Sequence, residues 1–444
     1  MNNEEPQAVL PKRPAALRAP HPAPGVELVG EQPDTGFKEK QWLVRREGRF
    51  LQVSELLYRI LERLDGRRSL PSVAADVTDA MPWTVTVENV QQIIETKLIP
   101  AGLVAAPNGT PASQRKRPRS PLAVSARRLV IGPRALDPIT RVLDLLFFPP
   151  LLAAVLAWIA LAHLWLYLGH GIGGPIRDAL MQPALALLAM LIFVVTAAFH
   201  ELGHASALRY GGGRAGGIGV GFYLIYPAFF TDTADAYRLG RWARVRVDLG
   251  GFYFQLIAAV ALMGLASASG QEWLLLPVLM INLEALRQLL FPFVRLDGYW
   301  LFADLAGIPD FFSHAVPFVR SLLPGSLRKR GELPALRRST KAVFLAYLVA
   351  TVPILGFLFF QIATRAPDFV VVAWQSFLAQ KGSLAHAVVT GDVAQAAGSL
   401  GQMLILAMPA IGTAVLSLVV TAWLASALWR RRQLAPRTPR RAAF

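Results

Sequence analysis

The stretch from residue 185 to residue 204, which reads LALLAMLIFVVTAAFHELGH, joins a long apolar run to a short polar group. Its length is close to the ~20 residues with which a helix spans a bilayer. On such a helix His200 and His204 lie on one face, one turn apart. Two imidazoles at this spacing can bind one zinc ion, and Glu201 is then placed to polarise a zinc-bound water. We therefore predict a metal site at the end of a membrane helix. The simpler alternative is a polar pair at the wet end of that helix, although ionisable groups in membranes are usually functional.

The composition is typical of a membrane protein. Of the 444 residues, 54% are hydrophobic and only 17% are charged, whereas about a quarter of a soluble domain is charged. The chain has no cysteine, which excludes disulfides and cysteine-ligated zinc, so a zinc site must use His, Asp or Glu. The net charge of +16 comes from Lys and Arg gathered in loops between apolar segments. We interpret these residues as topology signals facing anionic lipid, and we expect no nucleic-acid partner.

The apolar segments predict a mainly α, polytopic membrane protein with about six transmembrane helices. The six segments are residues 145–168, 185–202, 249–267, 273–291, 342–362 and 403–428. We assign them to a membrane domain over residues 141–430, followed by a basic tail at 431–444. With six spans, every strongly basic loop falls on one side, so the positive-inside rule makes both termini cytoplasmic. The histidine pair then lies at the cytoplasmic end of its helix.

The N-terminal part of the chain predicts a small α+β domain. Residues 1–28 are rich in Pro and Ala, and we expect them to be disordered. Residues 29–106 show two strand patterns around a turn and then three helical patterns, the order of a winged-helix fold. Its basic residues are offset by acidic ones, which argues against DNA binding. Residues 107–140 form a basic linker that we expect to lie as a flexible tether on the membrane surface.

A catalytic zinc site needs a third protein ligand, and Asp297 is the best candidate. It follows an apolar segment, returns to the membrane side of the histidine pair, and precedes a glycine that lets the backbone turn close to another group. Glu284 is the rival acid, but Arg287 three residues later favours an intramembrane ion pair. Asp232 and Asp235, in the intervening loop, are candidates for holding an imidazole N–H.

Three motifs, taken in chain order, carry a family resemblance. They are HELGH at residues 200–204, FTDTADAYRL at residues 230–239 and PFVRLDGY at residues 292–299. Together they resemble the site-2 protease family of membrane zinc metallopeptidases, in its bacterial branch of peptide zinc metalloproteases. The resemblance covers roughly residues 180–305, and HELGH followed by LDGY is its specific part. It implies a zinc endopeptidase in the bacterial cytoplasmic membrane that cleaves a peptide or membrane-anchored substrate near the cytoplasmic face.

The resemblance also implies a role for each site residue. Zinc would be held by His200, His204 and Asp297. Glu201 would be the general base that takes a proton from the attacking water and passes it to the leaving amine. The glycine-rich stretch at residues 211–230 would be an extended segment beside the site, able to pair with an unwound substrate.

Two positions depart from the family pattern. Phe291 stands where the family commonly has Asn before the proline of its second motif. The run GGFYFQ, which ends at Gln255, stands where the family has Gly-Pro followed by Asn. Those Asn residues are associated with holding substrate. The departures motivate an alternative, in which the chain is a catalytically inactive membrane binding or immunity factor that retains the zinc-peptidase fold. The presence of Glu201 argues against it, because an inactive chain has no need of the base.

The N-terminal domain carries a second resemblance. The runs RREGRFLQVS at residues 45–54 and LLYRILERLDG at residues 56–66 resemble PqqD-like domains, which bind the leaders of modified bacterial peptides. This implies that a leader peptide adds as a strand to the exposed edge of the hairpin. A generic winged-helix domain for dimerisation or regulation is the alternative. Together, the two resemblances imply a protease for the maturation of a modified bacterial peptide.

Overall fold

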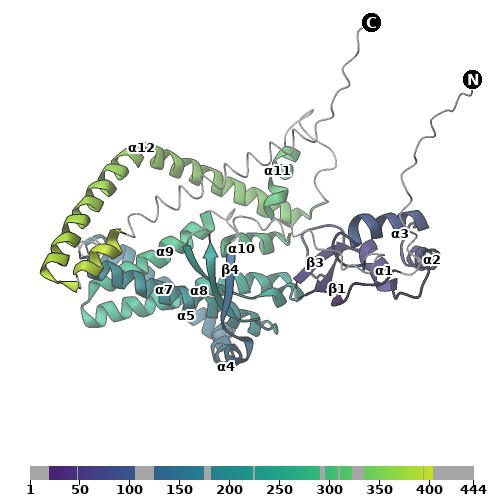
Figure 1. The fold of residues 1–444 in the computed structure, drawn as a ribbon, viewed down its shortest axis with the longest axis horizontal. Coiled ribbons are helices and arrows are strands. Elements are labelled where there is room, and N and C mark those ends of the chain that lie inside the picture. Colours follow the sequence, from purple (N-terminus) through teal and green to yellow (C-terminus); the bar gives the residue numbers. More distant parts are fainter. Residues whose placement is uncertain are drawn as a thin grey trace, which may run out of the picture. The chain divides into compact units, whose positions relative to one another are not determined.

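The structure is a computed structural model that describes residues 20–47, 49–105, 125–174, 182–223, 226–290, 296–308, 311–322, 335–393 and 395–403. The chain divides into two compact units, Met1–Arg119 and Ser120–Phe444. Figure 1 shows that helices make up most of the described residues, with a small sheet in each unit.

The first unit is a three-stranded antiparallel sheet followed by three helices. The sheet has the order β1 (Val26–Glu31), β2 (Gln41–Arg46) and β3 (Arg49–Ser54), and the helices are α1 (Glu55–Arg63), α2 (Leu70–Ala80) and α3 (Val87–Ile93), which continues into a π-helical turn, Ile94–Leu98. The expected hairpin and three helices are thus present, and β1 is an additional strand that pairs with the outer edge of β2. Pro22 also pairs with Val104. Ordered structure therefore begins before residue 29, where the disordered N-terminus was expected to end.

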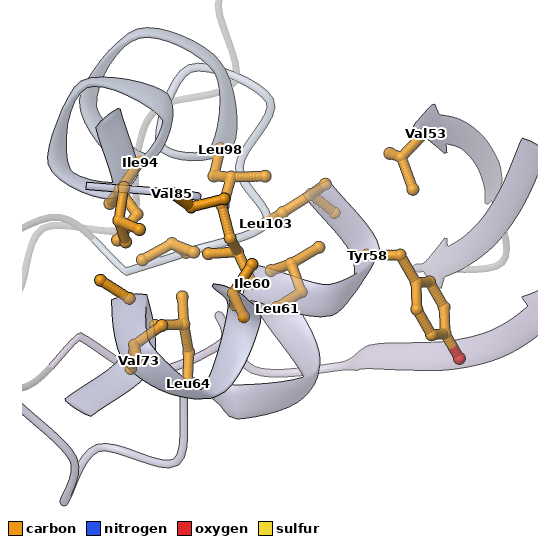
Figure 2. Packing of buried hydrophobic residues seen from close by; sticks show 14 of the residues in the cluster. Val53, Tyr58, Ile60, Leu61, Leu64, Val73, Val85, Ile94, Leu98 and Leu103 are labelled. Atoms are coloured by element: carbon orange, nitrogen blue, oxygen red, sulfur yellow. The ribbon is translucent and has the colours of Figure 1, made fainter. Parts of the chain in front are cut away.

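Apolar side chains from all three helices form the core of the first unit. Figure 2 shows Ile60 and Leu61 of α1 facing Val73 of α2 and Ile94 and Leu98 of the last turn, and all five are at most 1% exposed. The spacing of these residues places them on the inner face of each helix. The N-terminus of α3 is capped by the Thr86 hydroxyl oxygen, which accepts a hydrogen bond from the Asn89 backbone N–H at 3.3 Å.

The second unit begins with a strand where a linker was expected. Its sheet has the order β4 (Ser125–Ile131), β5 (Ile218–Tyr223) and β6 (Tyr226–Thr231), and all neighbours are antiparallel. The helix α4 (Pro133–Leu143) follows β4, so the linker predicted over residues 107–140 is wrong from residue 125 onward. Glycine at position 219 of β5 allows β4 to pair closely with β5, because a Cβ there would collide with the Arg128 carbonyl of β4. Residues 106–124 lie outside the described residues.

Among the described residues of the second unit, three helices are long and apolar enough to cross a membrane: Pro149–His170, Ala184–Tyr210 and Arg241–Ser269. They correspond to α5 (Pro149–Leu164) with its π-helical extension Trp165–His170, to α7 (Pro183–Tyr210) and to α8 (Arg241–Ser269). The described part of this unit also contains α9 (Leu275–Leu290), α10 (Asp297–Ala306), α11 (Phe311–Leu322) and α12 (Arg338–Thr390).

The prediction of six spans remains a prediction. The segment at residues 273–291 corresponds to α9, which has 16 residues. The segment at 342–362 is part of α12, a continuous helix of 53 residues. The segment at 403–428 lies almost entirely outside the described residues.

The helices α7 and α8 lie side by side, with their backbones in contact. A Cβ on Gly250 would stand 2.6 Å from the Gly203 carbonyl oxygen, and a Cβ on Gly203 would collide with the Gly250 carbonyl. Small residues at a crossing allow this close approach. The crossing falls within HELGH, so it brings the histidine pair against the middle of α8.

Candidate metal centre

The structure brings the three predicted ligands together. His200 and His204 project from α7, and Asp297 is the first residue of α10. The ligand atoms of the three residues all lie within 4.8 Å of one another. The His200 Nε2 atom is 2.9 Å from Asp297 Oδ2 and 3.0 Å from His204 Nε2, and His204 Nε2 is 3.4 Å from Asp297 Oδ1. Both histidines are buried, and Asp297 is partly exposed.

In both imidazoles the Nδ1 atom, which points away from the other ligands, has a hydrogen-bond acceptor. His200 Nδ1 donates to the side-chain oxygen Oε1 of Gln255 at 3.0 Å, and His204 Nδ1 donates to the backbone carbonyl of Val247 at 2.7 Å. A neutral imidazole carries one proton, so each Nε2 keeps a lone pair. Two lone pairs and the Asp297 carboxylate therefore point at one another, an arrangement that a cation stabilises. Two imidazole nitrogens and one carboxylate are the donor set of many catalytic zinc sites, so these residues fit the metal.

The predicted partners of the imidazoles are wrong. Asp232 accepts a hydrogen bond from the Ala234 backbone N–H at 3.2 Å, and Asp235 accepts one from the Arg214 backbone N–H at 3.0 Å. Asp232 therefore stabilises the turn after β6, and Asp235 joins that turn to the loop after α7. Gln255 does hold an imidazole, although the family pattern marks it only as a departure from a substrate-holding position. Helical spacing within α8 does not identify it, because the contact depends on how α7 and α8 cross.

Glu201 is held by the last residue of the sheet. The Thr231 hydroxyl, at the end of β6, lies 2.7 Å from Glu201 Oε2 and 2.9 Å from the Glu201 backbone oxygen, so it donates to one or shares its proton between them. Glu201 is buried, and its carboxylate interacts electrostatically with His200, His204 and Asp297. The general base expected from HELGH thus belongs to the same cluster as the ligands, and β6 ends beside it.

Glycines make room for the cluster. A Cβ on Gly251 would collide with the His200 imidazole, and a Cβ on Gly298 would collide with the Gln288 carbonyl of α9. The backbone of α8 therefore lies directly against a ligand ring, and α10 begins against the end of α9. These contacts give a physical reason for the glycine of LDGY.

A second acidic residue fixes α10. Asp304, seven residues after Asp297, accepts a hydrogen bond from Arg244 Nε of α8 at 2.6 Å, and Arg244 also donates to the Leu239 carbonyl at 2.8 Å. Burial raises the pKa of Asp304, against the lowering effect of Arg244. This pair ties the helix that carries Asp297 to the helix that contacts both histidines.

Glu284 takes no part in the cluster. Its carboxylate forms an ion pair with Arg287, with Nε 2.8 Å from Oε2, and accepts from Gln288 Nε2 at 3.1 Å. The predicted ion pair is confirmed, and Asp297 is the acid that faces the histidines.

Comparison of the chain with family models, with curated proteins and with solved structures finds no match. The family resemblances consequently rest on the motifs.

Proposed function

We propose that the second unit is a membrane-embedded zinc-dependent endopeptidase. His200, His204 and Asp297 would hold the metal, and Glu201 would act as the general base. The observation that carries the proposal is the convergence of three ligand atoms from two helices beside a buried glutamate. When bound, zinc supplies a Lewis acid that activates water and stabilises the negative charge on the attacked carbonyl oxygen.

The chain's own residues would handle the proton. Glu201 would accept a proton from the attacking water and deliver it to the leaving amine. Thr231 would orient the Glu201 carboxylate through its hydroxyl, because the two groups are 2.7 Å apart. The burial of both histidines would keep bulk water from competing for the metal.

The sheet supports a peptide as the substrate. Within the described strands β6 is an edge, and it ends at the residue that holds Glu201. An exposed edge binds an extended chain through main-chain hydrogen bonds. A peptide added along β6 would thus present an unwound backbone near the base, as peptide hydrolysis requires.

The first unit would recruit the substrate. Its β2 strand has β1 on one side and β3 on the other, so the free edges of the described sheet belong to β1 and β3. We propose that a leader peptide adds along β3, in a protein of the bacterial cytoplasmic membrane with both termini in the cytoplasm. The process would be the maturation of a modified bacterial peptide.

The test is a comparison of the purified full chain with three variants in detergent. The wild type should hold about one zinc and cleave a leader-bearing peptide. Asp297→Ala should lose zinc, and Glu284→Ala should retain it. Glu201→Gln should retain zinc and lose turnover by ~10²–10⁴-fold, because that is the usual contribution of a positioned base. Wild-type cleavage by Glu201→Gln would refute the peptidase and favour a binding or immunity factor.

A further inference from the structure

Gln255 places a buried amide directly on a metal ligand. The residue lies on α8 with 3% of its surface exposed, and its Oε1 atom is 3.0 Å from His200 Nδ1. An amide oxygen only accepts hydrogen bonds, so the proton of the neutral His200 ring stays on Nδ1. The lone pair is then on Nε2, the atom that faces Asp297 and His204.

The two histidines differ in what fixes them. His204 Nδ1 donates to the backbone carbonyl of Val247, and no side-chain substitution at Val247 removes that acceptor. The acceptor for His200 Nδ1 is instead the side chain of Gln255, which a substitution can remove. The contact between the Gly251 backbone and the His200 ring blocks one face of the ring, and the Gln255 bond sets its rotation.

We propose that Gln255 is a positioning residue of the metal centre, which holds His200 in the tautomer and orientation that bind zinc. This inference rests on the metal site of the proposed function and deepens it. It differs from the role expected from the family pattern, in which the residue at this position holds substrate. The Gln255 oxygen is already occupied by His200, and the side chain is buried. Replacing a residue that hydrogen-bonds a metal-binding histidine typically weakens metal affinity by ~10–100-fold.

The test measures zinc affinity of the full chain in detergent by competition with a chelator. Gln255→Met keeps the length of the side chain and removes the acceptor, so zinc should bind ~10–100-fold more weakly. Gln255→Glu keeps an oxygen at the same position and should bind zinc at least as tightly as the wild type. The matched control is Tyr253→Phe, which removes another hydrogen bond of a buried α8 side chain, from Tyr253 Oη to the Leu146 carbonyl at 3.1 Å. This control should bind zinc like the wild type.

A second measurement separates positioning from packing. In the cobalt-loaded chain, the visible absorption of the metal should change in Gln255→Met and stay unchanged in Tyr253→Phe. Unchanged zinc affinity in Gln255→Met, or an equal loss in Tyr253→Phe or Gln255→Glu, overturns the proposal. A raised KM with wild-type zinc affinity assigns Gln255 to the substrate instead.

Failure of the peptidase proposal gives a different result. A wild type that binds zinc but cleaves no peptide refutes the peptidase, and the zinc comparison still decides the role of Gln255. A wild type that binds no zinc overturns both proposals.

Discussion

His200 is fixed on all sides by residues that are distant in the sequence. Gln255 accepts from Nδ1, Asp297 lies 2.9 Å from Nε2, and the Gly251 backbone lies against the ring. Phe252 adds an edge-on contact, with ring centroids 5.7 Å apart. A ligand held this closely has little freedom to lose on binding a metal, so small changes in its surroundings should affect the metal strongly.

The first residue-scale prediction concerns Gly251. Gly251→Ala should displace the His200 ring, because the new Cβ would overlap it, and zinc affinity should fall at least tenfold. The control is Gly264→Ala on the same helix, where nothing lies within 4 Å of the added Cβ. That change should leave zinc bound and raise stability slightly, by about 0.5–1 kcal/mol, through helix propensity. Zinc competition and thermal unfolding check both variants, and equal zinc affinity in the two would contradict the packing described at His200.

At the scale of elements, the position of α10 determines whether Asp297 reaches the histidines. Arg244, only 3% exposed, binds Asp304 on one side and the Leu239 carbonyl on the other. Because Asp297 and Asp304 are seven residues apart, both lie on nearly the same face of α10. The ion pair at one end of the helix therefore orients the candidate metal ligand, Asp297, at the other.

The element-scale prediction removes this pair. Arg244→Met should destabilise the second unit by about 2 kcal/mol, less than the loss of a fully buried pair because Asp304 is 22% exposed. Zinc affinity should fall several-fold although no ligand has changed. The control is Arg287→Met, which breaks the more exposed pair with Glu284 and should cost at most ~1 kcal/mol. A zinc affinity for Arg244→Met equal to that of the control would show that α10 is held by other contacts.

The elements also show what the sequence could and could not predict. The histidine pair was predictable because helical spacing is local, and Asp297 was found through its motif. The strand β4 was missed because its partner, β5, lies about ninety residues later, and its basic residues resemble a linker. Arg127 in fact stacks on Phe230 of β6, with its guanidinium 3.8 Å from the ring centroid. The hydrogen bond between Gln255 and His200 could not be predicted from the sequence for the same reason, since it depends on a crossing between two helices.

At the scale of the whole molecule, the two units have separate cores, and the boundary falls at Arg119. We predict that a chain lacking residues 1–119 binds zinc like the full chain, because every residue of the metal centre lies in the second unit. A chain lacking residues 1–132 should unfold at lower temperature and bind zinc more weakly, because it loses β4 and exposes the edge of β5. Zinc content and thermal unfolding in detergent measure both. Equal behaviour of the two truncations would show that β4 contributes nothing to the second unit.

Because β4 pairs with β5 in the second unit, the chain that joins the two units is short. Val104 is paired in the first unit and Ser125 is paired in the second, so the chain between them can span at most roughly 70 Å. A peptide captured by the first unit would therefore be tethered to the second unit by this chain, at an effective concentration on the order of millimolar. Its encounter with the buried glutamate would then be governed by the length of chain between the units and would be nearly independent of how much substrate the cell contains.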